Sequence, residues 1–520
     1  MEPVPRLEGL GLLGQIPARN AAARPDEAAI VNPDGSVALT HQQLADRAAD
    51  TALALRHAGL GPGDRVLIAF NNTPHFFIAF FGTLAAGGVA VPVDSKLSLR
   101  ELTAVVQNAR PFCVLVDGEE HEEERDEADR TRLRAAFAGL PLLAVRAFGA
   151  APGWPVAEDA TDEPPAEPDP GALALILYTS GTTGTPKGVM HSHATILARL
   201  ELIRSWYRLE PDTRALCLLP THFGHGLICN CLAHMHAGGA VVLCHPFDID
   251  LVRRLWKVVA VCGATTFSSV PAVVRLLLLA DRRRSGARPS SLRFVTCASA
   301  PLRPEEVELF TERFGVELLN CYGITETASW TAFSPREAGR DSASVGIAYG
   351  CDIRAFNDAG QELATGEPGE LCVRGPAVML GYHGDPKLTG EVLADGWFRT
   401  GDMGRVDQDG RVYLMARLRE VINRAGMKIY PAPIDAALME HPAVAEAYAC
   451  AVEDAILGET VGACVVIRPE AQVSEAELIA HCRERLTAQH CPDRIRLMDA
   501  IPKTSRGKVN RANLAALFKS

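Results

Sequence analysis

The sequence lacks the features of an exported or membrane-spanning protein. Its first five residues, MEPVP, include no basic side chain, and no apolar run of the kind found in a signal peptide follows them. No stretch approaches the roughly 18 consecutive apolar residues that a membrane-spanning helix needs. We therefore expect a cytoplasmic protein that does not associate with membranes.

An excess of positive charge is also missing. The formal net charge is −11 at pH 7, which argues against general binding to nucleic acids or anionic membranes. A site for a phosphate-bearing ligand must therefore carry its own local cations.

Cysteine pairs with the spacing of metal or redox motifs are absent. The 14 cysteines extend from Cys113 to Cys491 without a Cys-x-x-Cys pair, and the two closest, Cys229 and Cys231, lie in an apolar run. Free cysteine is commonly a core residue, and the cytosol keeps thiols reduced. We expect buried, reduced thiols.

The length and the hydrophobic pattern predict more than one domain. A chain of 520 residues with 48% hydrophobic residues exceeds the size at which a single core keeps growing. Apolar runs at residues 66–68, 89–93 and 240–243 alternate with helical patterns such as 102–109 and 304–314. This alternation indicates an α/β fold in which helices cross over between parallel strands.

The most informative segment is residues 178–189, which read YTSGTTGTPKGV after the apolar run 173–177. Three glycines and five Ser/Thr residues around one lysine form a loop whose backbone N–H groups can hold a polyphosphate. The spacing excludes a Walker phosphate loop, because only two residues separate Gly181 from Gly184 and Lys187 precedes Gly188. An ordinary surface turn of the same composition is the alternative.

This segment resembles the phosphate-binding loop of the adenylate-forming superfamily, which includes acyl-CoA synthetases, adenylation domains and luciferases. Further motifs of that superfamily follow in its order: Ala86-Gly87-Gly88 with Val91-Pro92-Val93-Asp94, Tyr322-Gly323-Ile324-Thr325-Glu326, Gly369-Glu370-Leu371 with Gly381-Tyr382, Thr400-Gly401-Asp402, and Pro502-Lys503-Thr504 with Gly507-Lys508-Val509. The chain is therefore identified as a member.

The resemblance implies a large N-terminal domain of parallel-rich sheets with packed helices and a small, mobile α+β C-terminal lid. We expect the N-terminal domain to span residues 1–418 and the lid to span 419–520. Arg419 is the implied hinge, at a position where aspartate or lysine is commoner in the superfamily.

ATP and Mg²⁺ are the implied cofactors, and CoA is the implied second substrate. The residues implied to bind the nucleotide are Thr179, Ser180, Gly181, Thr183, Gly184, Lys187, Ser299, Ala300, Pro301, Tyr322, Gly323, Thr325, Asp402 and Arg417. Glu326 would hold Mg²⁺, which prefers carboxylate and phosphate oxygens. Catalysis is assigned to Lys508, Thr182, Glu326 and His225, with the Lys508 ammonium bridging the acid and the α-phosphate.

The acyl group is expected beside residues 220–227, which read PTHFGHGL. The pocket assigned to it consists of His222, Phe223, Gly224, Gly226, Ala298 and Ile324. The two glycines would leave the His225 ring unshielded, free to orient a substituent or deprotonate a nucleophile. A metal site formed with His234 and His236 is disfavoured, since no Asp, Glu or Cys completes a zinc quartet.

These features predict ATP-dependent activation of an aryl, alicyclic or medium-length apolar carboxylic acid, followed by thioester formation with CoA. Transfer of the acyl group to an amine or amino acid, or to a separate carrier protein, is the alternative. A non-enzymatic nucleotide-binding protein and a luciferase-type oxygenase are further alternatives. We expect a small-molecule carboxylic acid and ATP as partners, with CoA, an amine or a carrier protein as the acyl acceptor, no nucleic acid or membrane, and a possible homodimer.

Overall fold

The computed structural model describes residues 3–117, 127–146, 149–150, 167–179, 186–244, 249–280, 290–336, 341–425, 427–454, 457–469, 471–503 and 509–518. The chain divides into two compact units. Unit 1 comprises Met1–Asp352 and Val373–Phe398, and unit 2 comprises Ile353–Cys372 and Arg399–Ser520. This division follows the packing of the chain and does not locate a hinge. The boundary expected between residues 418 and 419 therefore stays a prediction.

Unit 1 contains a nine-stranded sheet whose central strands are parallel. In sheet order the strands are β16 (Ile347–Ala348), β15 (Ser329–Phe333), β14 (Glu317–Ile324), β13 (Phe294–Cys297), β12 (Thr266–Ser269), β10 (Arg214–Cys217), β11 (Ala240–Leu243), β1 (Ala28–Val31) and β2 (Val37–Thr40). The carboxyl ends of parallel strands meet at one edge, where ligands commonly bind in such sheets.

A second sheet of unit 1 has eight strands and is also mainly parallel. Its order is β19 (Gly381–Tyr382), β9 (Lys187–Ser192), β8 (Leu173–Thr179), β4 (Val89–Pro92), β3 (Arg65–Ala69), β5 (Cys113–Asp117), β6 (Leu142–Arg146) and β7 (Gly149–Ala150). The predicted parallel-rich α/β architecture is confirmed by these two sheets.

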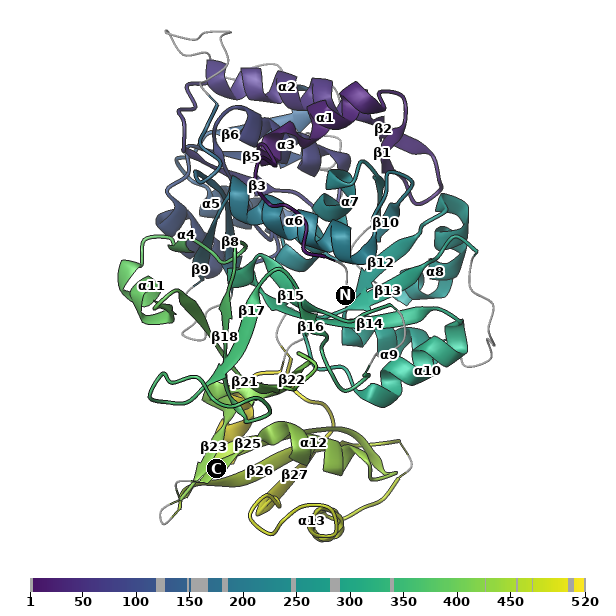
Figure 1. Ribbon diagram of the computed structural model, residues 1–520, viewed down its shortest axis with the longest axis vertical. Helices are drawn as coiled ribbons and strands as arrows, with labels where there is room; N and C mark the ends of the chain where they lie inside the picture. Colours follow the sequence, from purple (N-terminus) through teal and green to yellow (C-terminus); the bar gives the residue numbers. More distant parts are fainter. Residues whose placement is uncertain are drawn as a thin grey trace. The chain divides into compact units, whose positions relative to one another are not determined.

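The helices of unit 1 cover both faces of the two sheets (Figure 1). They are α1 (Ile16–Ala23), α2 (His41–His57), α3 (Pro74–Ala85), α4 (Leu99–Ala109), α5 (Glu127–Ala136), α6 (His193–Tyr207), α7 (Ala233–His236), α8 (Ile249–Cys262), α9 (Pro271–Ala280), α10 (Pro304–Phe314) and α11 (Pro386–Val392). Helices α8, α9 and α10 pack on the nine-stranded sheet, and α4 and α5 pack on the eight-stranded one.

One core of buried side chains joins the two sheets of unit 1. Helix α3 supplies much of it, because Phe76, Phe77, Phe80 and Phe81 are all fully buried. Pro74 begins this helix, a position where its fixed φ and missing N–H suit the first turn. The contacting rings lie one and four positions apart in the sequence, and their edge-to-face, stacked and tilted contacts place the centroids 5.2–6.5 Å apart.

Unit 2 has an α+β arrangement with a sheet of five strands. These are β24 (Met427–Ile429), β23 (Ile422–Arg424), β26 (Gly458–Ile467), β25 (Val444–Asp454) and, paired with β26, β27 (Arg494–Met498). Its helices are α12 (Pro431–Met439), α13 (Glu475–Arg483) and α14 (Arg511–Ala516). A further sheet, not confined to unit 2, contains β17 (Asp352–Phe356), β18 (Gly369–Arg374), β21 (Trp397–Val406), β20 (Leu393–Ala394) and β22 (Val412–Arg417).

The thiol prediction is confirmed. All 14 cysteines are free, and each is buried apart from Cys351, which is half-buried. Burial raises the pKa of several of them, such as Cys229 to about 12, so these thiols stay protonated at neutral pH. In the part of the chain that the structure describes, no helix has the length and apolar content to span a membrane.

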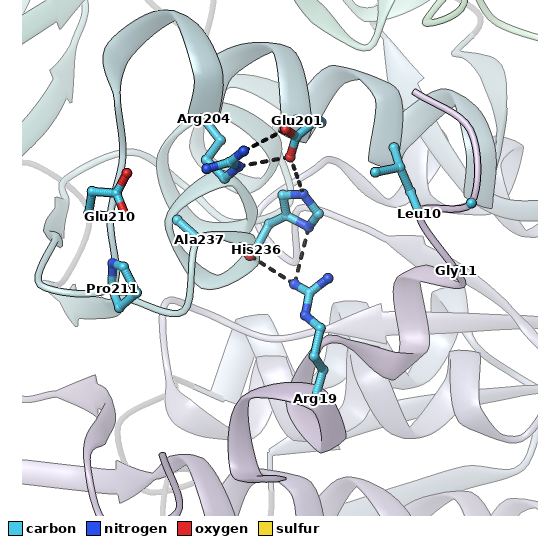
Figure 2. Close-up of a pocket in the computed structure, with 10 residues that line it drawn as sticks. Leu10, Gly11, Arg19, Glu201, Arg204, Glu210, Pro211, His236 and Ala237 are labelled. Atoms are coloured by element: carbon cyan, nitrogen blue, oxygen red, sulfur yellow. Dashed lines mark hydrogen bonds and ion pairs between the residues drawn. The ribbon is translucent and has the colours of Figure 1, made fainter. Parts of the chain in front are cut away.

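A network of charged side chains lines a pocket beside the N-terminal segment of unit 1 (Figure 2). Glu201 of α6 accepts two hydrogen bonds from Arg204, at 2.8 and 2.7 Å, and lies 3.0 Å from Nε2 of His236. Arg19 of α1 donates to the His236 carbonyl oxygen at 2.8 Å. Burial opposes ionisation of Glu201, but the hydrogen bonds from Arg204 and His236 outweigh burial and lower its pKa to about 2.

The Glu201 network predicts a pH-dependent stability. The carboxylate stabilises the fold fully above its unfolded pKa of 4.5, and this contribution is lost as the pH falls toward about 2. We expect Glu201→Gln to lower the free energy of unfolding by about 1.5–3 kcal/mol at pH 7, the range for a hydrogen bond to a charged group. Urea unfolding at pH 7, 5, 4 and 3 should show the difference shrink below pH 4.5.

Glu210→Gln is the matched control, because Glu210 lines the same pocket but is exposed. It should change the unfolding free energy little at any pH. A Glu201→Gln effect that stays constant from pH 7 to pH 3 would contradict the lowered pKa.

Candidate functional site

The glycine-rich loop is carried by two antiparallel strands of unit 1. Thr179, the last residue of β8, pairs with Lys187, the first residue of β9. Gly188 lies under the Tyr178 ring, since a Cβ there would come within 3.1 Å of that ring. The strands therefore fix both ends of the loop. Ser180, Gly181, Thr182, Thr183 and Gly184 lie outside the described residues.

Glu326, Tyr382 and Lys187 come together where β9 begins. The Tyr382 hydroxyl donates a 2.8 Å hydrogen bond to Oε1 of Glu326. Nζ of Lys187 lies 5.6 Å from the centroid of the Tyr382 ring, within range of a cation–π contact. Tyr382 belongs to β19, which pairs with β9, so one strand pairing sets the positions of the tyrosine and the lysine. The carboxylate thus has a fixed orientation and a cation nearby.

Buried groups hold the segment that carries Glu326. Nε2 of His191 lies 2.8 Å from the Thr325 carbonyl oxygen, and the guanidinium of Arg199 donates to the Thr327 carbonyl oxygen at 3.2 and 3.3 Å. Burial lowers the pKa of His191 to about 4, so its ring is neutral at pH 7. Gly323 precedes the segment, and a Cβ there would lie 1.9 Å from the Ser329 carbonyl oxygen. Only glycine permits this approach of the two backbones.

The residues around Glu326 fit a Mg²⁺ ion that would take most of its ligands from a bound nucleotide and from water. Glu326 is half-buried, and within the described part of unit 1 its Oε2 atom has no partner. The described residues contain no group of three or more His, Cys, Asp or Glu side chains arranged for a metal ion. Mg²⁺ commonly takes one or two carboxylates and completes its shell with water and phosphate oxygens. A single oriented carboxylate matches that pattern.

His225 begins a π-helix, η3 (His225–Leu232), and hydrogen-bonds through both ring nitrogens. Nδ1 lies 3.0 Å from Oγ of Ser299, and Nε2 lies 2.9 Å from Oγ of Ser268. Ser268 in turn contacts Oγ1 of Thr296 at 2.6 Å. Ser299 adopts a φ of +75°, which is uncommon for a residue with a side chain and marks a constrained turn. The ring is therefore held between two hydroxyl groups.

The expected open space around His225 is not there. The residue is only 3% exposed, and its ring packs against Trp330 with centroids 5.2 Å apart. Gly226 faces the Pro220 backbone, because a Cβ would lie 2.3 Å from that carbonyl oxygen. The idea that the glycines leave the ring unshielded was therefore wrong. Gly226 is needed so that η3 can start close to Pro220.

The other residues assigned to the acyl pocket have varied surroundings. Phe223 is half-buried, 6.4 Å from the His225 ring, and Gly224 lies beside Leu177. Ala298 is part of the main core, and Ile324 packs on the cluster that contains Tyr382. The assignment of these residues to an acyl pocket stays a prediction.

Each of the four histidines near η3 contacts a different partner. His222 lies 3.5 Å from Oδ2 of Asp94, and Nε2 of His234 lies 2.9 Å from Oγ1 of Thr266. His225 bonds the two serines, and His236 bonds Glu201. They do not converge on one point.

The expected adenine side of the site follows the ends of β13 and β14. Ser299, Ala300 and Pro301 lie in the turn between β13 and α10, and Ala300 and Pro301 are exposed. Tyr322 is 6% exposed within β14, and its carbonyl oxygen accepts a hydrogen bond from Thr331 at 3.3 Å. Both segments leave the same edge of the nine-stranded sheet, because β13 and β14 are parallel neighbours.

In unit 2, Asp402 and Arg417 form an ion pair. Nε of Arg417 lies 2.8 Å from Oδ1 of Asp402, and the two residues are directly opposite in the antiparallel pair β21 and β22. Asp402 is 5% exposed, so the guanidinium compensates a nearly buried carboxylate. Glu370 holds the preceding turn by accepting from the Gly401 N–H at 3.1 Å. The sequence placed these two residues in one site, and the structure brings them together.

The residues assigned to lid motion and catalysis lie farther along unit 2. Arg419 is exposed in a short 3₁₀ turn, η5 (Leu418–Glu420), that directly follows β22. Lys508 lies outside the described residues, so its predicted role stays a prediction.

The sequence analysis did not identify three residues that the structure adds to the candidate site. Tyr382 had a signal, since Gly381-Tyr382 belongs to the motifs that carry the resemblance. Ser268 and Thr296 had no motif, and only the tendency of parallel strands to place polar groups at their carboxyl ends could have indicated them.

Comparisons with known proteins agree with this geometry. A family model described as AMP-binding enzyme matches residues 17–383, and one described as AMP-binding enzyme C-terminal domain matches residues 433–508. The sulfoacetate–CoA ligase of Cupriavidus necator is 34% identical over 507 residues, covering 96% of this chain and 97% of that protein. A feruloyl-CoA synthase of an Amycolatopsis species is 33% identical over 511 residues, covering 97% and 99%.

A solved structure has the same architecture. The crystal structure of ATP-bound MatB from Rhodopseudomonas palustris gives a TM-score of 0.86 at 27% identity and covers 98% of this chain and 99% of that one. The family match spans most of the chain, and the likeness to relatives and to this structure extends over nearly its whole length. The chain therefore belongs to the AMP-binding enzyme family of the adenylate-forming superfamily.

Proposed function

We propose that this protein is an AMP-forming acid–CoA ligase that works in two half-reactions. In the first, a carboxylate oxygen of the acid attacks the α-phosphorus of ATP, and pyrophosphate leaves with the electrons of the broken P–O bond. In the second, the thiol of CoA loses its proton and attacks the carbonyl carbon of the acyl-adenylate. AMP then leaves with the oxygen that came from the acid.

The observation that carries this proposal is the Glu326–Tyr382 hydrogen bond beside Lys187. It holds a half-buried carboxylate and a cation next to a loop whose composition suits a polyphosphate. Mg²⁺ bound to Glu326 would neutralise charge on the phosphates when pyrophosphate leaves. Lys187 would contact phosphate oxygens directly.

Further residues would bind the rest of the nucleotide. One carboxylate can accept from two neighbouring hydroxyls, and Asp402, oriented by Arg417, suits the ribose in this way. Tyr322 and the turn Ser299–Ala300–Pro301 would contact the adenine, while Thr325 and Thr182 would contact phosphate. Lys508 would bridge the acid and the α-phosphate.

The surroundings of His225 favour a carboxylic acid whose acyl group is short or flat. Ser268, Thr296 and Trp330, of which the first and last contact the ring, line a small and partly open cavity of about 10 Å³, which has room for about one water molecule. A long acyl chain would not fit in a cavity of this size. The rings of Phe223, His225 and Trp330 suit an aryl, alicyclic or medium-length acid, and the hydroxyls of Ser268 and Ser299 could orient a polar substituent through His225.

CoA is the acceptor that we favour over an amine. The ring of His225, the base proposed for an amine nucleophile, is 3% exposed and is held between two serine hydroxyls, so an incoming amine has little access to it. The named relatives include several CoA ligases and also a fatty acid–[acyl-carrier-protein] ligase of Streptomyces coeruleorubidus. A carrier protein is therefore the second candidate acceptor.

Pyrophosphate release with ATP, Mg²⁺ and a panel of acids tests the first half-reaction. We expect release with at least one aryl, alicyclic or medium-length acid and none with a long-chain fatty acid. CoA, amino acids or a carrier protein added separately should then distinguish the acceptors, with product mass as the readout. Absence of release with every acid would contradict adenylation, and an amide or acyl-carrier product without a CoA thioester would contradict the CoA assignment.

Glu326→Gln should weaken the dependence of adenylation on Mg²⁺, because it removes the charge but little volume. Loss of one charge-assisted contact predicts at least about a tenfold rise in the Mg²⁺ concentration for half-maximal rate. Glu362→Gln, at an exposed ion pair with Arg354, is the control and should leave the titration unchanged. A Mg²⁺ titration of Glu326→Gln identical to that of the parent would show that Glu326 is structural.

Lys508→Ala should slow adenylation by about 10²–10³-fold, the usual cost of losing one preorganised charge-stabilising donor. Thioester formation from supplied acyl-adenylate should continue, because we expect Lys508 to act only in the first half-reaction. Arg468→Ala is the control, since Arg468 is an exposed cation of the same unit that lies far from Lys508 in the sequence. Equal losses in both half-reactions would contradict a role confined to adenylation.

His225→Ala should change the ranking of acids while the apparent affinity for ATP stays the same. Ser268→Ala removes one of the two hydrogen bonds of the ring and should change the ranking in the same direction but less. Initial rates of pyrophosphate release across the acid panel measure both effects. If neither variant alters the ranking, His225 is a core histidine and not part of the acyl pocket.

A further inference from the structure

Arg199 of α6 is a buried cation that pairs with no carboxylate among the described residues. The residue is 1% exposed. Its Nε and Nη2 atoms donate to the Thr327 carbonyl oxygen at 3.3 and 3.2 Å, and its Cζ atom lies 5.8 Å from the centroid of the Phe333 ring. Nη1 has no hydrogen-bond partner in the described part of the chain. The guanidinium therefore contacts neutral groups.

The ionisable neighbours of Arg199 do not neutralise its charge. Burial raises the pKa of the thiols of Cys229 and Cys351, that of Cys229 to about 12, so both stay protonated at neutral pH. Burial also lowers the pKa of Arg199, but an arginine stays charged at neutral pH. An apolar side chain of similar size would cost less free energy to bury. Stability alone therefore does not account for an arginine at this position.

The backbone that Arg199 holds has an uncommon conformation. Thr327 ends the turn η4 (Thr325–Thr327), and the next two residues, Ala328 and Ser329, adopt φ values of +48° and +77°. Left-handed residues with side chains are costly and persist where their surroundings hold them. The peptide group between Thr327 and Ala328 contains the carbonyl that accepts from Arg199. The two hydrogen bonds thus fix the peptide plane from which the left-handed turn starts.

Glu326 lies in the same turn. Its carbonyl oxygen accepts from the Met379 N–H at 2.8 Å, and the carbonyl oxygen of Thr325 lies 2.8 Å from Nε2 of His191. Arg199 holds the third carbonyl group in succession, and it does so with two donors. The direction of the Glu326 side chain therefore depends on contacts from three separate segments, of which the contact from Arg199 is doubled.

We propose that Arg199 is a positioning residue for Glu326, whose guanidinium holds the left-handed turn after η4 and so aims the carboxylate at the Mg²⁺ of a bound nucleotide. A turn released from the guanidinium would relax at Ala328, and the carboxylate would lose its fixed direction. This inference rests on the proposed function, in which Glu326 binds Mg²⁺.

Arg199→Met tests the inference, because methionine removes both donors and fills much of the same space. We expect the Mg²⁺ concentration for half-maximal adenylation to rise about threefold to tenfold, the equivalent of one hydrogen bond to a neutral acceptor. The KM for the acid and the rate of thioester formation from supplied acyl-adenylate should change less than about twofold. Arg336→Met is the matched control and should have no effect. Arg336 also lies over a ring, 4.9 Å from the centroid of Phe294, but it is paired with Glu317.

Glycine at position 328 separates positioning from general damage. Glycine adopts a positive φ without strain, so Ala328→Gly alone should change the Mg²⁺ titration less than about twofold. Combined with Arg199→Met, it should restore most of the lost Mg²⁺ dependence, because the turn no longer has to be held against strain. A merely structural arginine predicts the reverse, since loss of the buried Ala328 methyl would add to the damage. A further loss in the double variant would overturn the proposal.

A second double variant tests whether Arg199 acts through Glu326. If it does, Arg199→Met should add almost nothing to the rise in Mg²⁺ requirement caused by Glu326→Gln. Multiplicative effects of the two substitutions would overturn the proposal.

Hydrogen–deuterium exchange of the free protein gives a readout that needs no activity. The Ala328 N–H donates to the Thr325 carbonyl oxygen at 3.0 Å, so Arg199→Met should speed exchange in peptides covering residues 324–330 and leave those of β26 unchanged. Arg199→Lys keeps one donor and should have a smaller effect in the same direction, which provides a second variant if Arg199→Met does not fold.

Exchange at 324–330 that is unchanged in both variants would overturn the inference. A parent that adenylates no acid would overturn the proposed function instead, and the exchange rates would still decide whether Arg199 holds the turn.

Discussion

Adenylation must bring two anions, a carboxylate and a triphosphate, into contact, and the rest of the site depends on how their repulsion is overcome. A chain with a net charge of −11 offers no general positive field for this task. The charges are instead local: Lys187 lies beside Tyr382, and Arg417 pairs with Asp402. Each carboxylate proposed to touch the nucleotide or its metal is also fixed by a donor, Glu326 by a hydroxyl and Asp402 by a guanidinium. Preorganised groups of this kind lose little free energy to reorganisation during the reaction.

Backbone packing holds these groups in place. Gly323 permits the approach of the Ser329 backbone, and Gly226 permits η3 to start against Pro220. The π-helix places His225 between Ser268 of β12 and Ser299 of the turn after β13. In unit 2 the guanidinium of Arg511 pairs with Glu420 of the turn η5 (Leu418–Glu420) and with Asp435 of α12 (Pro431–Met439). Substrate preference would then depend on the rigid surroundings of His225, and the order of the two half-reactions on the lid.

Hydrophobic alternation predicted the α/β class, and the scattered single cysteines predicted the buried thiols. The resemblance to the superfamily assigned Asp402 and Arg417 to one ribose site, and the structure shows that they form an ion pair. The sequence could not predict the Glu326–Tyr382 hydrogen bond or the contacts of His225 with Ser268 and Ser299. These partners come from distant strands, and only the tertiary fold brings them together. The glycines beside His225 were misread as open space for the same reason, since a sequence shows a missing side chain but not the backbone that fills its place.

The claim that the acid's own oxygen attacks the α-phosphorus is tested most directly by isotope transfer. An accepted acid labelled with ¹⁸O at its carboxylate is incubated with the enzyme, ATP, Mg²⁺ and CoA, and the products are examined by mass spectrometry. If the acyl-adenylate forms and CoA then attacks its carbonyl carbon, the AMP released must carry one ¹⁸O and the pyrophosphate none. Unlabelled AMP, or ¹⁸O in pyrophosphate or inorganic phosphate, would contradict the mechanism.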